Sequence, residues 1–214
     1  MLTYYLLGGI GKYKPSIYLA RIPISHNEIG SLILDKIMKH KGKAMMKAFF
    51  ALLDKLNESD RKQVEGYSLS EIKRIEKLYD ITIQGDFLEF MLRMGRCSGG
   101  LFGDDPIVLY KEQRSVRSQI LFQLITLDFL HDHHYEMRAQ QPFCFSWESE
   151  TQYLFILTQS EDQLVYGYDE YEEAIYETGK TFEEYMFAVY EYYEHYFIDD
   201  DGKRIVCKGE LLVF

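Results

Sequence analysis

The spacing of apolar residues changes once along this chain, near residue 140, and this change constrains the fold more than any other feature. Before it, apolar residues recur every three or four positions, which is typical of helices that bury one face. After it, short aromatic and β-branched runs are separated by polar turns, which predicts a meander of antiparallel strands. Helices first and strands later, without βαβ alternation, predict an α+β fold with antiparallel strands.

Local patterns give the bounds of these elements. Ser68 with Glu71, and Thr181 with Glu184, form two capping boxes, each of which starts a helix. The longest helix is predicted at residues 114–131, and its apolar stripe consists of Val116, Ile120, Leu124 and Leu127. Strands are predicted at residues 143–145, 153–157, 164–168 and 173–176, with further short strands at 107–110 and 205–213.

The first 67 residues differ in pattern from the rest. A hairpin is expected from strands at residues 3–7 and 16–22, followed by helices at 27–40 and 44–56. We therefore predict an N-terminal hairpin and two-helix extension over residues 1–67 and an α+β domain over 68–214, together forming one compact unit.

The composition narrows the class of protein. With 47% hydrophobic and 27% charged residues, the chain is expected to be globular rather than disordered. Its three cysteines do not suggest a disulfide framework, and they indicate a reducing compartment. Because we find neither a signal-like start nor an apolar run of about 18 residues, we expect a cytoplasmic protein without a membrane span.

The net charge of −10 is unevenly distributed. Residues 1–66 carry 11 Lys/Arg and 6 Asp/Glu, whereas residues 148–201 carry 16 Asp/Glu and a single base, Lys180. Such a region repels phosphate backbones and anionic lipid headgroups and attracts cationic proteins. The sequence therefore predicts a basic protein partner, and neither nucleic acid nor a membrane. A solvated acidic face that only keeps the protein in solution is the alternative interpretation.

Aromatic residues are interleaved with these acids. Many of the 18 tyrosines lie here, and tyrosine combines rigid contact area with a polar tip that suits a cationic protein surface. The predicted partner-binding residues are Trp147, Asp162, Tyr166, Tyr168, Asp169, Glu170, Glu172 and Glu173. An ordinary sheet face built from strand-favouring tyrosines would give the same pattern.

Few residues suggest catalysis. His131, His133 and His134 could ligate a metal, but neighbouring residues on a helix point about 100° apart and a His-Glu-x-x-His spacing is missing. Cys97 is predicted to be a packed thiol. The sequence thus predicts a non-enzymatic protein without a cofactor or metal, and a hydrolase centred on the three histidines remains the alternative.

One ordered set of motifs resembles the opening of the SUKH superfamily. This set comprises Glu71-Ile72, Ile75-Glu76, Ile81, Ile83, Asp86-Phe87, Phe90-Met91 and Gly99-Gly100. Residues 151–155 resemble the central strand of that family, residues 165–169 the strand that follows, and residues 182–185 its closing helix. The resemblance covers about residues 68–197.

This resemblance implies an α+β domain with a mostly antiparallel (mixed) sheet flanked by helices and without a catalytic centre. Many bacterial members of the superfamily look like immunity proteins that neutralise toxin domains, often nucleases, and fungal relatives look like regulators of cell-wall glucan synthesis. The resemblance transfers no binding residues, so the acidic region is the expected site. Two functions follow from it: an immunity protein that neutralises a basic toxin domain, or a regulatory scaffold of an enzyme complex that uses the helices of residues 27–57.

Overall fold

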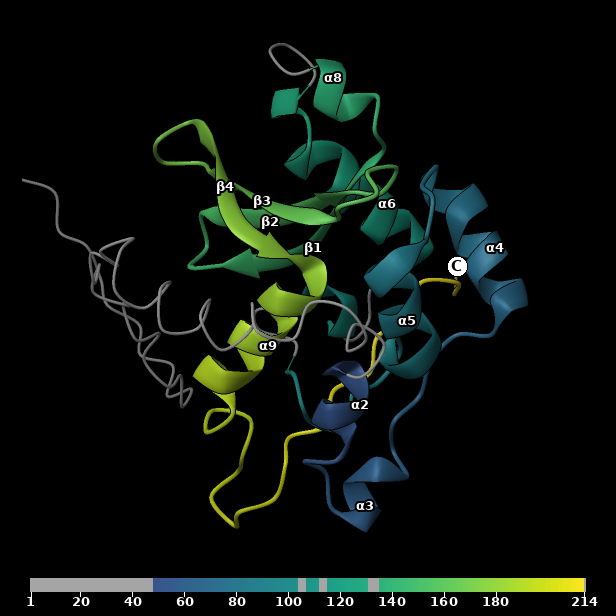
Figure 1. Ribbon diagram of the computed structural model, residues 1–214, viewed down its shortest axis with the longest axis vertical. Helices are drawn as coiled ribbons and strands as arrows, with labels where there is room; N and C mark the ends of the chain where they lie inside the picture. The colour runs from purple at the N-terminus through teal and green to yellow at the C-terminus, as the bar shows by residue number, and fades with distance from the viewer. Residues whose placement is uncertain (1–47, 104–106, 112–114, 131–134, 214) are drawn as a thin grey trace, which may run out of the picture.

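The computed structural model describes residues 48–103, 107–111, 115–130 and 135–213, and it confirms the α+β fold. One four-stranded sheet has the order β1-β2-β3-β4, and every neighbouring pair is antiparallel. The strands are β1 (Pro142–Glu148), β2 (Gln152–Leu157), β3 (Leu164–Asp169) and β4 (Ala174–Thr181). The predicted meander is therefore present, with each strand beside the next one along the chain (Figure 1).

Helices surround this sheet (Figure 1). They are α2 (Ala48–Leu53), α3 (Glu58–Arg61), α4 (Leu69–Tyr79), α5 (Gly85–Met94), the 3-10 helix η1 (Val108–Tyr110), α6 (Val116–Thr126), α8 (Tyr135–Arg138) and α9 (Phe182–Tyr193). Both predicted capping boxes are formed, at Ser68 before α4 and at Thr181 before α9. The starts of α4 and α9 were therefore predicted correctly from local sequence.

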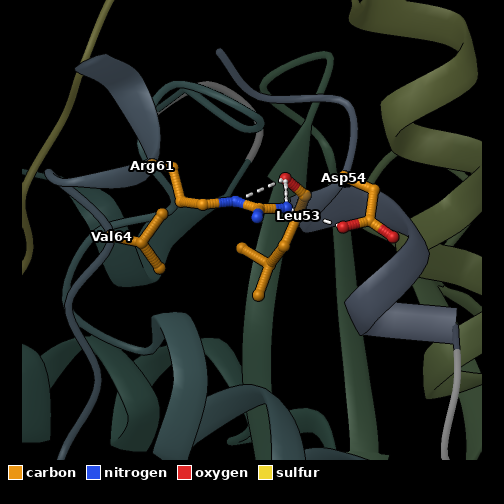
Figure 2. Close-up of a pocket in the computed structure, with 4 residues that line it drawn as sticks. All are labelled: Leu53, Asp54, Arg61 and Val64. Carbon is orange, nitrogen blue, oxygen red and sulfur yellow. Dashed lines mark hydrogen bonds and ion pairs between the residues drawn. The ribbon is translucent and has the colours of Figure 1, made fainter. Parts of the chain in front are cut away.

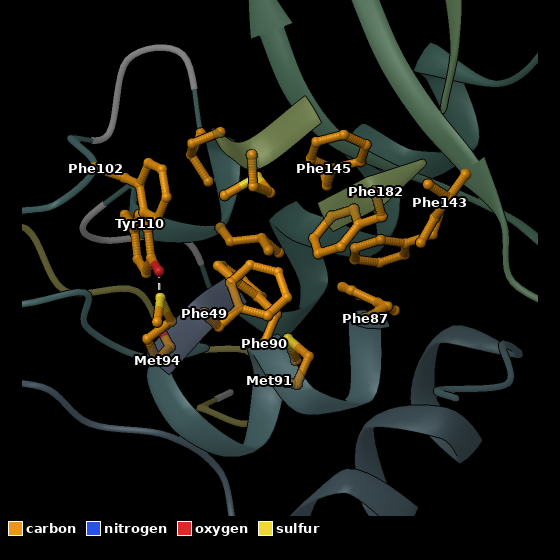
Figure 3. Close-up of a cluster of buried hydrophobic side chains, with 14 of the residues drawn as sticks. Phe49, Phe87, Phe90, Met91, Met94, Phe102, Tyr110, Phe143, Phe145 and Phe182 are labelled. Atoms are coloured by element: carbon orange, nitrogen blue, oxygen red, sulfur yellow. Dashed lines mark hydrogen bonds between the residues drawn. The ribbon is translucent and has the colours of Figure 1, made fainter. Parts of the chain in front are cut away.

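The main core lies between one face of the sheet and helices α2, α4, α5 and α9. Phe182, the first residue of α9, is at its centre, with its ring 5.3 Å from that of Phe87, 5.4 Å from Phe90 and 4.9 Å from Phe145 (Figure 3). Phe49 of α2 packs against Phe90 and Phe182. These aromatic contacts fix α9 beneath the sheet and hold β4, which runs directly into α9, in place.

The core includes part of the predicted N-terminal extension. Of the helix expected at residues 44–56, Ala48–Leu53 is helical, and Phe49, Leu52 and Leu56 belong to the same buried cluster as the sheet. The predicted hairpin at residues 3–7 and 16–22 and the helix at 27–40 lie outside the described residues.

A smaller core covers the opposite face of the sheet. Its centre is Leu130, Cys144, Phe155 and Leu157, and side chains from α6, α8 and the connection between them pack around it. Here the predicted stripe of α6 is only partly right: Val116 is buried and Leu127 packs against this core, but Leu124 does not face it. The buried residues are Val116, Gln119, Gln123 and Thr126, whereas Leu124 is 63% exposed.

The reason is that two backbone groups of the edge strand β1 require hydrogen-bond partners. The side chain of Gln123 donates to the Cys144 carbonyl oxygen (2.7 Å) and accepts from the Cys144 N–H (2.8 Å). One amide thus satisfies two buried backbone groups that a further strand would otherwise pair. This pair of hydrogen bonds turns the Gln123 face of the helix inward, and the observed bounds of α6 are shorter than the predicted 114–131.

Two other predicted strands are absent. Residues 107–110 form a single bridge between Ile107 and Ser146 followed by η1, which turns Leu109 and Tyr110 into the core. Residues 205–213 pair with no strand among the described residues. Isolated backbone hydrogen bonds hold this segment, such as that from the Gly209 N–H to the Arg96 carbonyl oxygen (2.9 Å). Two tyrosines add to them: the Leu211 N–H donates to the Tyr67 hydroxyl, and the Tyr79 hydroxyl donates to the Leu211 carbonyl oxygen.

Candidate protein-binding surface

Two hairpin turns lie at the same end of the sheet. The β1–β2 turn and the β3–β4 turn are joined by a hydrogen bond from the Glu170 N–H to the Thr151 carbonyl oxygen (2.8 Å). We call residues 148–152 and 169–174 the hairpin end. Glu150 (φ 63°) and Glu173 (φ 50°) take left-handed conformations there, which tighten the turns although neither residue is glycine.

The hairpin end is densely acidic. It contains Glu148, Glu150, Asp169, Glu170, Glu172 and Glu173, and the sequence has no Lys, Arg or His from residue 148 to 179. Glu150, Glu170, Glu172 and Glu173 are exposed. Their separation is short because the two turns are adjacent, so their fields add at the surface.

Tyr171 stands among these acids and is 78% exposed. Its backbone is fixed, because the Asp169 carboxylate accepts from the N–H groups of Tyr171 (2.9 Å) and Glu172 (3.2 Å). An exposed aromatic ring on a fixed turn is the type of side chain that supplies contact area at protein interfaces. The hairpin end therefore combines an anchor residue with a negative field.

A row of stacked aromatic rings supports this surface from one face of the sheet. Trp147, Tyr153 and Tyr168 come from three adjacent strands, with ring centroids 5.9 and 6.5 Å apart. Phe129 stacks on Tyr168 at 3.7 Å, and the Tyr153 hydroxyl donates to the Glu170 carboxylate (3.1 Å). These rings are half-buried, so they stiffen the hairpin end more than they display contact area.

The opposite face holds two of the acids internally. The Tyr185 hydroxyl donates to the Glu148 carboxylate, and the Gln152 amide donates to the Asp169 carboxylate (3.4 Å). Tyr176 of β4 lies over Gly167 of β3, where a β-carbon would collide with its ring. Glu148 and Asp169 therefore build the hairpin end, and their charge adds to its field.

Burial and the nearby carboxylates together raise the pKa values of three tyrosines at this surface. Burial, and then the hydrogen bond to Glu170, raise the pKa of Tyr153 to about 12. Burial, and then Glu148 and Asp169, raise the pKa of Tyr176 to about 12 on the other face. Burial, followed by Glu173, Glu170 and Asp169, also raises the pKa of Tyr168. The tyrosines therefore stay neutral donors while the surrounding carboxylates supply the charge.

The structure gathers only part of the predicted site. Trp147, Tyr168, Glu170, Glu172 and Glu173 lie at or beside the hairpin end, and Tyr166 lies one row further along the same face, stacked on Phe155 (5.7 Å). Asp169 turns to the other face. Asp162 lies at the far end of β3, where it accepts from the Ser160 hydroxyl (2.7 Å) and the Leu164 N–H (3.3 Å).

Glu177 follows the hairpin end on β4, but other acids of residues 148–201 lie elsewhere. The turn at Asp199–Asp201 follows α9 and lies on the loop at the bottom of Figure 1. Glu183 and Glu184 lie at the start of α9, which begins where β4 ends, and act electrostatically with Asp86 and with each other. Tyr171 was missing from the predicted set, although its acidic neighbours on both sides were the available signal.

Other parts of the described chain give weaker evidence for a metal-binding or catalytic site. Outside the gaps, no three His, Cys, Asp or Glu side chains are grouped to hold a metal ion, while His131, His133 and His134 lie outside the described residues. Burial raises the pKa of Cys97, which is the opposite of what a reactive thiol needs.

A shallow pocket lies between α2 and α3, lined by Leu53, Asp54, Arg61 and Val64 (Figure 2). Its guanidinium is already engaged, since Arg61 donates to the Leu53 carbonyl oxygen (2.8 Å) and to the Asp54 carboxylate (2.6 Å). The pocket therefore presents no unused charged group to a ligand.

Comparisons with protein-family models, with curated proteins and with solved structures find no match for this chain. Among the described helices, none has the length and apolar character needed to cross a bilayer.

Proposed function

We propose that this protein is a binding module that captures a cationic protein at the hairpin end, and that the partner is a basic, nuclease-type toxin domain which it neutralises. The observation that carries the proposal is the combination of a highly exposed Tyr171 with four exposed glutamates on two fixed turns. A nuclease domain must carry positive charge to approach phosphates, so an acidic surface can occupy its cleft.

The resemblance to the SUKH superfamily supports the same function. The segments that carry it form α4, α5, β2, β3 and α9, in the order that the superfamily pattern expects. Ile72, Ile75, Ile81, Ile83 and Phe87 all lie in the main core, so these motifs serve the fold. They leave the binding surface to be defined by charge.

Association kinetics test the proposal. The probe is a basic, nuclease-type toxin domain that carries an inactivating substitution. Glu172→Lys with Glu173→Lys should slow association at low salt at least tenfold, because electrostatic steering is lost. Asp200→Lys with Asp201→Lys makes the same change of charge on the turn after α9 and should have a smaller effect. Equal effects of both pairs, or association that is independent of salt, would contradict the proposal.

The regulatory scaffold receives less support. Its expected contact was the helices of residues 27–57, and in the described part of that range Phe49, Leu52 and Leu56 are buried in the core. Those three side chains are therefore not available to a partner.

A further inference from the structure

The two edge strands of the sheet, β1 and β4, differ in how their outer backbone groups are paired. At the β1 edge, Gln123 of α6 takes both backbone groups of Cys144, and Ile107 forms a bridge with Ser146. At the β4 edge, the only strand partner within the described residues is β3, on the inner side. Half of the backbone groups of an edge strand point away from the sheet, where they can pair with another chain.

The usable part of this edge is short and regular. Ala174, Ile175 and Tyr176 pair in register with Asp169, Tyr168 and Gly167, respectively, and Glu177 pairs with Tyr166. Beyond Glu177 the strand bulges: the Thr178 hydroxyl donates to the Val165 carbonyl oxygen (2.7 Å), and Gly179 takes a left-handed φ of 69°. A bulge of this kind ends regular pairing. The open stretch is therefore Ala174–Glu177, which directly continues the hairpin end.

The charge beside the edge selects its occupant. Glu172 and Glu173 precede the open stretch and Glu177 lies within it, and all three are exposed. A second copy of β4 would bring glutamates against glutamates, and like charges on paired strands are destabilising. A strand that carries Lys or Arg would instead make opposite-charge pairs across the new ladder.

We propose that the partner adds an extended, lysine- or arginine-bearing segment to the outer edge of β4, along Ala174–Glu177. This inference rests on the proposed function and specifies how the cationic partner binds beside the hairpin end. The hairpin end would attract the partner over a distance, and β4 would fix its orientation through backbone hydrogen bonds.

The test uses the full-length ¹⁵N-labelled chain and an eight-residue peptide of alternating lysine and valine. Two further peptides carry backbone N-methyl groups, one on the lysines and the other on the valines, so that only one edge of each peptide loses its donors. We expect the unmodified peptide and one methylated peptide to shift the amide signals of Ala174–Glu177. The other methylated peptide should not, because its binding edge is blocked.

A matched pair of variants tests the charge selection. Glu177→Lys should weaken binding of the unmodified peptide roughly two- to five-fold, as expected for one cross-strand charge pair, and Asp201→Lys should leave it nearly unchanged. Binding that is equal for all three peptides would overturn strand addition and leave the acidic surface intact as a binding site.

Two other outcomes would also overturn the inference. If the β4 amides that point away from β3 already exchange slowly with deuterium in the isolated monomer, a segment of residues 1–47 occupies the edge. If the chain alone is a dimer and its outward-pointing amides in Ala174–Glu177 become exposed to exchange on dilution to the monomer, a second copy occupies it. The salt dependence of association with the toxin domain is measured separately, so failure of strand addition is distinguishable from failure of the proposed function.

Discussion

Acidic side chains in this protein have two different roles: some hold local backbone structure, and others are exposed at the proposed binding surface. Asp169 and Asp162 accept backbone N–H groups in turns, and Glu71 completes a capping box, so their charges serve local structure. Glu172 and Glu173 are exposed beside Tyr171. Composition counts all of these acids equally, whereas the structure separates the acids that accept turn or cap N–H groups from those exposed beside Tyr171. Substitutions at the first kind should change stability, and those at the second kind should change binding.

Glu183 should make stability depend on pH. Burial, with repulsion from Asp86 and Glu184, raises its pKa to about 7 in the folded chain. A carboxyl whose folded pKa exceeds its unfolded value of about 4.5 holds its proton better when folded, so stability falls as the pH rises from about 4.5 to 7. Glu183→Gln should remove this loss and raise the melting temperature at pH 8 more than at pH 5.

The exposed Glu191 on the same helix provides the control. Glu191→Gln should change the melting temperature little at either pH. If Glu183→Gln gave the same shift at pH 5 and pH 8, the raised pKa would be wrong.

Among the charged residues beside the main core, Arg96 should be the one whose substitution lowers the unfolding free energy most. Its guanidinium donates to Glu71 (2.8 Å) and Glu210 (3.0 Å) and lies 4.2 Å from the centre of the Tyr67 ring. Arg96→Met should cost about 2–4 kcal/mol of unfolding free energy in urea, since two carboxylates lose their partner. Arg74→Met, an exposed change on α4, should cost less than about 0.5 kcal/mol.

The same ion pair predicts acid sensitivity. Arg96, and then the Ser68 backbone, lower the pKa of Glu71 to about 2. The stabilisation is therefore present above pH 4.5 and is lost as the pH falls from there towards 2. The difference in unfolding free energy between wild type and Arg96→Met should shrink over this interval. A difference that stays constant from pH 6 to pH 2.5 would contradict the assignment.

The secondary-structure elements were predictable where their signals are local. Aromatic and β-branched runs and the capping boxes of Ser68 and Thr181 need only neighbouring residues. They predicted β1 to β4, α4 and α9, although β1 and β4 are longer than predicted. The buried face of α6 was not predictable, because it depends on Cys144, a residue of an edge strand 21 positions beyond Gln123. Residues 205–213 were misread for the same reason, since Tyr67 and Tyr79 hold them from a distance.

Two substitutions on α6 test this explanation. Gln123→Leu increases the apolar character of the helix, yet it should cost roughly 2–4 kcal/mol because the Cys144 N–H and carbonyl oxygen lose their partner. Leu124→Gln should change the unfolding free energy by less than about 0.5 kcal/mol, because Leu124 is already exposed. Urea unfolding measures both. The reverse ranking is what the apolar stripe of the sequence would require, and it would contradict the structure.

The molecule as a whole divides one acidic stretch of sequence among separate surfaces. The sequence predicted one acidic binding region over residues 148–201. The meander instead brings the turns after β1 and β3 together and leaves Asp162 at the opposite end of the sheet. The sign and approximate location of the site were predictable from charge. Its membership was not, because adjacency of the two turns depends on strand register, and register also decides that Tyr168 faces the aromatic row while Asp169 faces Tyr176.

The hairpin end is best tested by mapping hydrogen–deuterium exchange on the chain bound to the inactive toxin domain. Slower exchange on binding should be confined to residues 148–152 and 169–177. The turn at Asp199–Asp201 should exchange as it does in the free protein. Protection that appears on that turn or on α6, with the hairpin end unchanged, would show that the partner binds elsewhere and would contradict the proposed function.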